Sequence, residues 1–184
     1  MMRLFYCVEL DQNAREALGR LIEELRRRLP QGKWVPPGNL HLTVRFLGEV
    51  EEEQLPGLLE LGQRVAAESE PSSLILKVIS AFPSPRRARV LWVGPLDGDQ
   101  GFLDLCRRVE AGVRALGFPP ETKEPRAHVT LVRFRRPQDL SPYLGDIQLE
   151  ALDVPVQVLT LMRSELRPEG ARYTPIERWE LGGG

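Results

Sequence analysis

The sequence predicts an α+β fold in which a duplicated unit makes two similar lobes of a single domain spanning residues 1–184. Three observations lead to this prediction. Segments with strand alternation and segments with helical periodicity follow one another along the chain. The stretch "RVLWVGPL" at 89–96 resembles "RLFYCVEL" at 3–10, and a helical segment follows each. A short motif, histidine–apolar–threonine–apolar, then comes after each helix, as an internal repeat requires.

The first unit begins with a strand over residues 3–10. Asp11 offers an N-cap for a helix over 12–29, which carries an apolar stripe and is ended by Pro30 and Gly32. A motif strand follows over 41–47. Residues 51–67 have the pattern of a helix, and 74–82 and 90–94 have the pattern of two strands joined by "PSPRRAR".

The second unit repeats this order. A helix is expected over 102–116, and a second motif strand over 128–134. A short helical segment near 140–144 follows. A final strand pair is expected over 156–164 and 173–181, around the turn "LRPEGAR".

Composition limits the classes of function. Hydrophobic residues make up 42% and charged residues 28% of the chain, which is ordinary for a soluble globular protein. The short apolar start runs into Glu9 and Asp11, so it indicates a strand rather than a signal peptide, and we expect a cytoplasmic monomer without membrane association. Cys7 and Cys106 lack metal-ligand spacing and are expected to be buried thiols. The net charge of −1 means that any site for an anion must be local.

The two histidines of the chain, His41 and His128, stand in the same motif. Each has a threonine two residues later, at Thr43 and Thr130, although threonine occupies only five positions in the sequence. A lone histidine beside apolar residues is most often structural, but this coincidence favours a functional pair. Residues i and i+2 of a strand point to the same side, so each motif presents an imidazole beside a hydroxyl.

Two such strands facing each other predict in-line attack on a phosphodiester. One imidazole would deprotonate the incoming oxygen, and the other would protonate the leaving oxygen on the far side of phosphorus. The threonine hydroxyls would donate hydrogen bonds to the oxygens of the phosphate. Neither motif contains an acidic residue, so we expect no metal site and no cofactor.

The paired motifs, with "PPGNLHLTVRFLGEV", "RVLWVG", "HVTLVRF" and the closing "LMRSELRPEGARY", resemble the two-histidine phosphoesterase superfamily. Within it, the chain is similar to the bacterial and archaeal RNA 2′,3′-cyclic phosphodiesterases, also called 2′-5′ RNA ligases. The resemblance covers essentially the whole chain. It implies a bilobal fold of two antiparallel sheets flanked by helices, with both histidines in a central groove. It also implies opening of a terminal 2′,3′-cyclic phosphate to a 2′-phosphate, with reversible 2′-5′ joining of RNA ends in some members.

Carried onto this sequence, the resemblance makes His41 the general acid and His128 the base that activates water. It assigns Thr43, Thr130 and Arg133 to the phosphate. Strand parity alone would place Arg133 on the face opposite Thr130, so a bulge or the strand's end must turn it. The chain departs from many relatives at position 127, where alanine replaces the proline before the second histidine.

Strand parity also divides the first motif. It places Arg45 on the face of His41 and Thr43, and Phe46 on the core face with Leu42 and Val44. Arginine at position 45 is more often a solvated strand residue than a ligand.

Other features are less specific. Three arginines near the second motif could guide an RNA backbone, although such a run is usually a solvated face; they are Arg126, Arg135 and Arg136. Three aromatic residues could stack a base, although aromatics at strand spacing are more often core; they are Trp34, Trp92 and Tyr173.

Two alternatives remain open. The chain could be a non-catalytic module that grips a terminal RNA phosphate, which predicts binding without turnover. The same chemistry could also act on a different substrate, such as a small nucleotide cyclic phosphate, a 2′-5′ oligonucleotide or an ADP-ribose cyclic phosphate.

Overall fold

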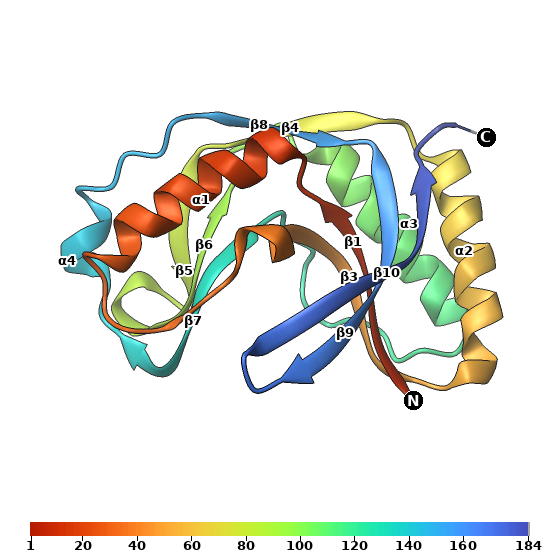
Figure 1. The fold of residues 1–184 in the computed structure, drawn as a ribbon. Coiled ribbons are helices and arrows are strands. Elements are labelled where there is room, and N and C mark those ends of the chain that lie inside the picture. The colour runs from red at the N-terminus through yellow and green to blue at the C-terminus, as the bar shows by residue number, and fades with distance from the viewer. Residues whose placement is uncertain (184) are drawn as a thin grey trace.

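The computed structural model describes residues 1–183, and in them no helix is long and apolar enough to cross a bilayer. Residues 1–183 form ten strands and four α-helices, whose arrangement is drawn in Figure 1. Their bounds in chain order are β1 (Met2–Glu9), α1 (Gln12–Arg26), β2 (Lys33–Trp34), β3 (His41–Val50), α2 (Leu55–Glu68), β4 (Ser72–Leu76), β5 (Val78–Phe82), β6 (Ala88–Gly94), α3 (Gln100–Ala115), β7 (Val129–Gln138), α4 (Ser141–Leu144), β8 (Leu152–Val156), β9 (Val158–Arg167) and β10 (Gly170–Glu180).

The strands form two four-stranded antiparallel sheets and one separate pair. Sheet A has the order β10-β9-β1-β3, and sheet B has the order β2-β7-β6-β5. Strands β4 and β8 pair with each other in a third, two-stranded sheet. The α+β class and the two antiparallel sheets expected from the sequence are confirmed, and each sheet carries one motif strand.

Each sheet draws its elements from both halves of the chain. Strands β1 and β3 of sheet A lie beside β9 and β10 from the C-terminal end. Helix α3 follows β6 of sheet B but packs with α2 against sheet A, whereas Figure 1 shows α1, which follows β1, lying over sheet B. The lobes are therefore interleaved rather than consecutive in sequence. The duplication of the unit stays a prediction.

Local sequence accounts for the helix boundaries. The Asp11 side chain accepts a hydrogen bond from the backbone N–H of Ala14 at 2.9 Å, as the predicted N-cap requires. Helix α1 ends at Arg26, one turn earlier than expected, because the chain must leave the helical conformation before Pro30. Glu51 and Gln54 form a reciprocal capping box in the turn that leads into α2.

The strand expected over 74–82 is wrong as a single element. The chain breaks at Lys77 into β4, which pairs with β8, and β5, which pairs with β6. Periodicity alone predicts one strand because both segments alternate in the same way. The short strand β2 was not expected, since its two residues are too few to show a pattern.

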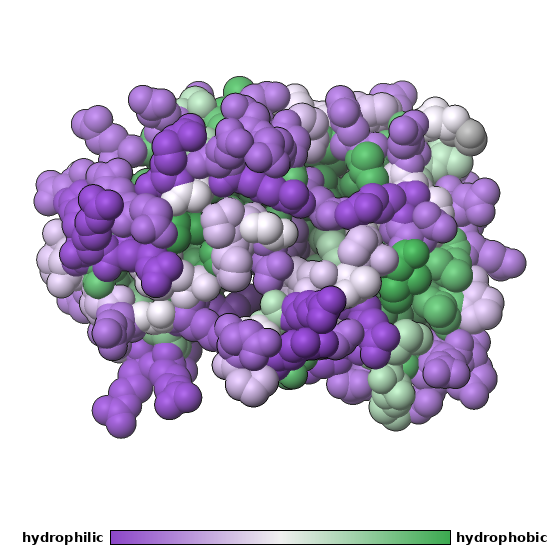
Figure 2. Space-filling model, in the orientation of Figure 1, coloured by the Kyte–Doolittle hydropathy of each residue, from purple (hydrophilic) through white to green (hydrophobic). Residues whose placement is uncertain are grey.

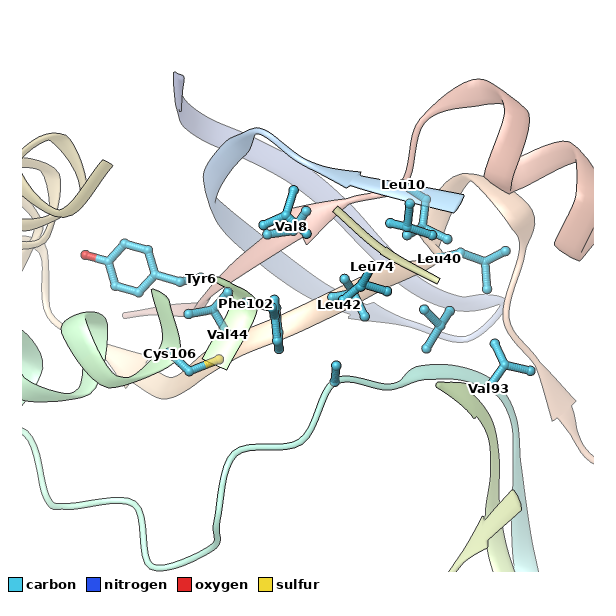
Figure 3. Close-up of a cluster of buried hydrophobic side chains, with 14 of the residues drawn as sticks. Tyr6, Val8, Leu10, Leu40, Leu42, Val44, Leu74, Val93, Phe102 and Cys106 are labelled. Carbon is cyan, nitrogen blue, oxygen red and sulfur yellow. The ribbon is translucent and has the colours of Figure 1, made fainter. Parts of the chain in front are cut away.

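The hydrophobic core is continuous between the sheets and their helices. Figure 3 shows part of it, where Tyr6 and Val8 of β1 and Val44 of β3 lie close to Phe102 and Cys106 of α3. Burial on this scale holds sheet A against its helices, at about 25 cal/mol for each Å² of apolar surface removed from water. Both cysteines are buried, as expected.

Candidate active site

The two motif strands are neighbours in space. Strand β3 is the outer strand of sheet A, and it contacts β7 of sheet B. His41 is the first residue of β3, and His128 immediately precedes β7, whose assigned bounds run from Val129 to Gln138 rather than over 128–134. Strand β3 also continues beyond Gly48, where the sequence predicted its end. Gly48 adopts a φ of 71°, which glycine tolerates, and the pairing with β1 shifts register there, between Leu4 and Phe5. Figure 2 shows a hollow rimmed by hydrophilic side chains between the part of the molecule formed by sheet B and the β9–β10 hairpin.

Both motif strands carry a bulge at the residue after the motif threonine. In β3, Thr43 pairs with Cys7 and Arg45 pairs with Tyr6, so Val44 is the extra residue. In β7, Thr130 pairs with Trp92 and Val132 pairs with Leu91, so Leu131 is extra. A bulge of this kind puts two consecutive side chains on the same face and reverses the alternation beyond it.

The bulge in β7 brings Arg133 to the face of Thr130. Arg133 pairs with Val90 and Thr130 pairs with Trp92, and residues 90 and 92 share one face of β6. The positive charge of Arg133 lowers the pKa of both His41 and His128, in agreement with its place on this face. The bulge that the sequence required to bring Arg133 to the face of Thr130 is thus present.

The bulge in β3 has the opposite consequence for Arg45, whose expected position is wrong. Arg45 lies opposite Tyr6, on the helix-facing side of sheet A, and its side chain is only 10% exposed. Its guanidinium donates to both carboxylate oxygens of Glu110 in α3 at 3.1 Å, and to the carbonyl of Pro119. Arg45 therefore forms a largely buried ion pair with Glu110, and its side chain faces neither solvent nor the two histidines.

The expected core position of Phe46 is also wrong, for the same reason. Phe46 pairs with Phe5, whose ring centroid lies 5.5 Å from that of Phe46 and 5.1 Å from the His41 imidazole. The Phe46 side chain is 53% exposed on the histidine face. An apolar ring is thereby presented beside the first motif.

The His41 imidazole is held on three sides. Its Nδ1 lies 2.7 Å from the carbonyl oxygen of Asn39, and a carbonyl only accepts, so Nδ1 carries a proton. Its Nε2 lies 2.9 Å from the Thr43 hydroxyl. The rings of Phe5 and Tyr173 pack against it, with the Tyr173 centroid at 5.5 Å in an edge-on arrangement.

The His128 imidazole is held in a parallel way. Its Nδ1 lies 3.0 Å from the carbonyl oxygen of Arg126, again two residues earlier in the chain. The edge of its ring packs on Phe82, at 5.2 Å between centroids, and on Trp92. Both histidines therefore keep the proton on Nδ1, so Nε2 is the nitrogen that can gain or lose a proton.

Burial lowers the pKa of both imidazoles below the ordinary value. For His41, the hydrogen bond to the Asn39 carbonyl opposes this effect, the charges of His128 and Arg133 add to it, and the carboxylate of Glu9 opposes it. For His128, the Arg126 carbonyl opposes the effect of burial, while the charges of Arg133 and Arg126 add to it. A carboxylate therefore lies near the first ring, and a second arginine near the other.

Comparisons with known proteins identify a family model over the first half of the chain and relatives that cover nearly all of it. A family model described as LigT like phosphoesterase matches residues 8–92. An RNA 2′,3′-cyclic phosphodiesterase of Thermus thermophilus is 38% identical over 99% of this chain and 91% of its own length. One from Methanothermobacter thermautotrophicus is 32% identical over 98% of this chain and 99% of its own. The chain belongs to the LigT-like phosphoesterase family. The resemblance noted in the sequence is confirmed.

Solved structures share the fold of this LigT-like phosphoesterase. The crystal structure of TT0787 from Thermus thermophilus superposes with a TM-score of 0.85 at 37% identity, covering 99% of both chains. LigT of E. coli complexed with 3′-AMP gives a TM-score of 0.77 at 26% identity, covering 98% of both chains.

The other arginine and tryptophan side chains considered in the sequence of this LigT-like phosphoesterase lie at different distances from the two histidines. The Arg126 guanidinium lies 5.4 Å from the centre of the Trp92 ring, beside His128. Arg135 and Arg136 are exposed farther along β7. Trp34 is half-buried and pairs with Val132.

Sequence reasoning missed four groups that face the histidines of this LigT-like phosphoesterase; they are Phe5, Glu9, Asn39 and Phe46. Glu9 pairs directly with His41 across β1 and β3, and it accepts hydrogen bonds from Thr160 and Arg178. The alternation of β1 was the available signal, because it puts residues 5 and 9 on one face. It does not say which face meets the motif strand. Among residues 1–183 there is no group of three His, Cys, Asp or Glu side chains placed to hold a metal ion.

Proposed function

We propose that this chain hydrolyses the 2′,3′-cyclic phosphate at the end of an RNA to a 2′-phosphate, with His41 and His128 as its catalytic acid and base. The observation that carries the proposal is the matched orientation of the two imidazoles, each with Nδ1 bound to the carbonyl two residues earlier, so that Nε2 is the nitrogen that can exchange a proton. Relatives at 32–38% identity over nearly the whole chain are RNA 2′,3′-cyclic phosphodiesterases, which supports the substrate class.

In the proposed step, the Nε2 of His128 takes a proton from water while the water oxygen bonds to phosphorus. The bond between phosphorus and the 3′ oxygen breaks, and His41 gives its Nε2 proton to that oxygen. The products are a 2′-phosphate and a free 3′-hydroxyl. His128 then loses a proton and His41 gains one from solvent, which restores the starting state.

The surroundings of the two rings support this assignment of roles. The Glu9 carboxylate favours the protonated form of His41, as an acid requires. The Arg126 guanidinium favours the neutral form of His128, as a base requires. The reverse assignment would place Glu9 and Arg126 where each opposes the required protonation state, whereas Arg133 favours the neutral form of both rings.

Three further groups are proposed to hold the phosphate. The Thr43 hydroxyl is already within hydrogen-bond distance of the reactive nitrogen of His41. Thr130 and Arg133 share the groove-side face of β7, so a hydroxyl and a guanidinium could reach one phosphate together. Arg133 would supply the positive charge that stabilises the transition state, so the proposed step needs no metal ion and no cofactor.

The nucleoside is proposed to lie on the sheet A side. The leaving 3′ oxygen belongs to the terminal ribose, so that ribose must be near the acid, His41. The exposed Phe46 ring lies on the same face, linked to His41 through Phe5, and every base offers a flat face that stacks on such a ring. A 5′-hydroxyl in the place of water would give a 2′-5′ bond by the same proton transfers.

The proposal is tested with an RNA oligonucleotide ending in a 2′,3′-cyclic phosphate, incubated in excess EDTA with wild type, His41→Ala and His128→Ala. Conversion to a 2′-phosphate that persists in EDTA and is lost in both variants supports the proposal. Binding of the RNA without conversion by wild type would replace it with the binding-module alternative. Turnover that EDTA abolishes would overturn the metal-independent step.

A further inference from the structure

We propose that Asn39 is a positioning residue that latches the β9–β10 hairpin over His41 and so holds the imidazole in its reactive orientation. The inference concerns how the histidine is held, and its role in catalysis rests on the function proposed above. Asn39 lies in the short turn between β2 and β3, two residues before His41.

Asn39 makes two hydrogen bonds in different directions. Its backbone carbonyl accepts from Nδ1 of His41 at 2.7 Å. Its side-chain Nδ2 donates to the backbone carbonyl of Ala171 in β10 at 2.9 Å, a partner 132 residues away. One residue thus binds both the imidazole and the hairpin.

The free end of the hairpin extends beyond the strand with which it pairs in sheet A. Strand β9 pairs with β1 only from Thr160 to Ser164, and Ser164 lies opposite Arg3. His41 lies opposite Glu9, at the other end of β1. Residues 165–172 pair only with each other and extend beyond the part of β9 that pairs with β1. Figure 1 shows this end of the hairpin projecting from the sheet. The bond to Ala171 ties this projecting end beside the first motif.

Tyr173 carries the effect of the latch to the imidazole. It follows Ala171 by two residues, so both lie on the same face of β10. Its ring packs edge-on against His41 at 5.5 Å and against Phe5 at 5.1 Å. Because the Tyr173 ring and the latched carbonyl belong to one hairpin, loss of the latch should let water reach His41.

Loss of the latch has a signature that a general loss of stability would lack. The titratable and charged groups near His41 are Glu9 from β1, Tyr173 from β10, Arg133 from β7, and His128, which is the residue before β7. Burial is the main cause of the lowered pKa of His41. Admitting water should therefore raise that pKa, while the surroundings of His128 stay the same.

The experiment is an NMR titration of the two imidazoles in wild type, Asn39→Ala, Tyr173→Ala and the double variant. The chain has only two histidines, and His128→Ala assigns them. Asn39→Ala keeps the backbone carbonyl and removes only the side-chain donor. Asn13→Ala is the matched control, because Asn13 is exposed on α1.

We expect Asn39→Ala and Tyr173→Ala each to raise the pKa of His41 and leave that of His128 unchanged. The pKa of His41 in the double variant should match that in Tyr173→Ala, because Asn39→Ala acts on His41 only through the packing of the Tyr173 ring. With a cyclic phosphate substrate, we expect Asn39→Ala to lower kcat about tenfold with little change in KM, since the acid is misoriented rather than lost. Asn13→Ala should match wild type in every measurement.

An unchanged pKa of His41 in Asn39→Ala would overturn the latch, and so would equal shifts at both histidines or additive shifts in the double variant. The titration needs no substrate. Failure of the proposed hydrolysis would therefore leave the result on the latch intact, and the two proposals fail separately.

Discussion

Phe46 and Arg133 occupy equivalent positions in the two motif strands. Each is the fifth residue after a motif histidine, and in each strand a bulge after the threonine turns it to the histidine's face. The two lobes thus use one backbone device to present different side chains, an aromatic ring beside His41 and a guanidinium beside His128. In the proposed reaction, the first contacts the nucleoside and the second the phosphate.

Replacing Arg133 by alanine should reduce kcat/KM about 10²- to 10³-fold, as expected when a group that stabilises transition-state charge is removed. The melting temperature should change little, because Arg133 is exposed. Steady-state kinetics and a thermal melt test this. Activity within threefold of wild type would show that the bulge does not bring Arg133 to the phosphate.

Replacing Arg45 by alanine should have the opposite effect. The variant loses charged hydrogen bonds to Glu110 in a largely buried site, so the free energy of unfolding should fall by about 2 kcal/mol. Denaturant titration measures the change. At a temperature where the variant is folded, its activity should stay near that of wild type, and a loss as large as that of Arg133→Ala would contradict the assigned face.

Replacing the exposed Phe46 by alanine should raise KM for a cyclic phosphate substrate about tenfold. The reason is the loss of one stacking contact with the base, which contributes about 1–3 kcal/mol. We expect kcat to change less than KM. Ile75→Ala is the matched control, because Ile75 is an exposed apolar residue in the separate β4–β8 pair. Equal KM values for Phe46→Ala and Ile75→Ala would contradict the proposal that the nucleoside binds on the sheet A side.

The pH dependence of activity should be bell-shaped, because His41 must start protonated and His128 neutral. Glu9→Gln removes a negative charge near His41, which lowers the pKa of His41 and should move the alkaline limb to lower pH. Arg126→Gln removes a positive charge near His128, which raises the pKa of His128 and should move the acidic limb to higher pH. Profiles of kcat/KM test both shifts. Movement of the acidic limb by Glu9→Gln would indicate that the two roles are exchanged.

Stability should fall on acidification because of the two histidines. The folded state lowers the pKa of both imidazoles, so their contribution is complete above the ordinary value of 6.5. Below it, the unfolded chain binds protons that the folded chain does not, and the contribution is lost as pH falls through the lowered pKa values. Denaturant titrations between about pH 7.5 and pH 5 should show a smaller decrease for a His41→Gln, His128→Gln double variant. Equal decreases would show that the imidazoles are not buried in their neutral form.

The sequence by itself determined the α+β class, the two motif strands and the imidazole and hydroxyl groups that each of them carries. Alternation over a few residues is sufficient for these, because neighbouring imidazole and hydroxyl groups at i and i+2 depend only on local strand geometry. The rarity of histidine and threonine made the repeat visible.

Only the tertiary structure decided which side chains join the histidines. A bulge arises from the pairing of two strands, so Arg45 and Phe46 exchange faces in a way that the alternation of β3 does not reveal. Glu9 and Tyr173 reach His41 through strand pairing and ring contacts with distant segments, and Asn39 joins His41 to the hairpin through its bond to Ala171. The interleaving of β9 with β1 and the packing of α3 on sheet A likewise depend on which buried faces meet, and contacts between distant residues determine that.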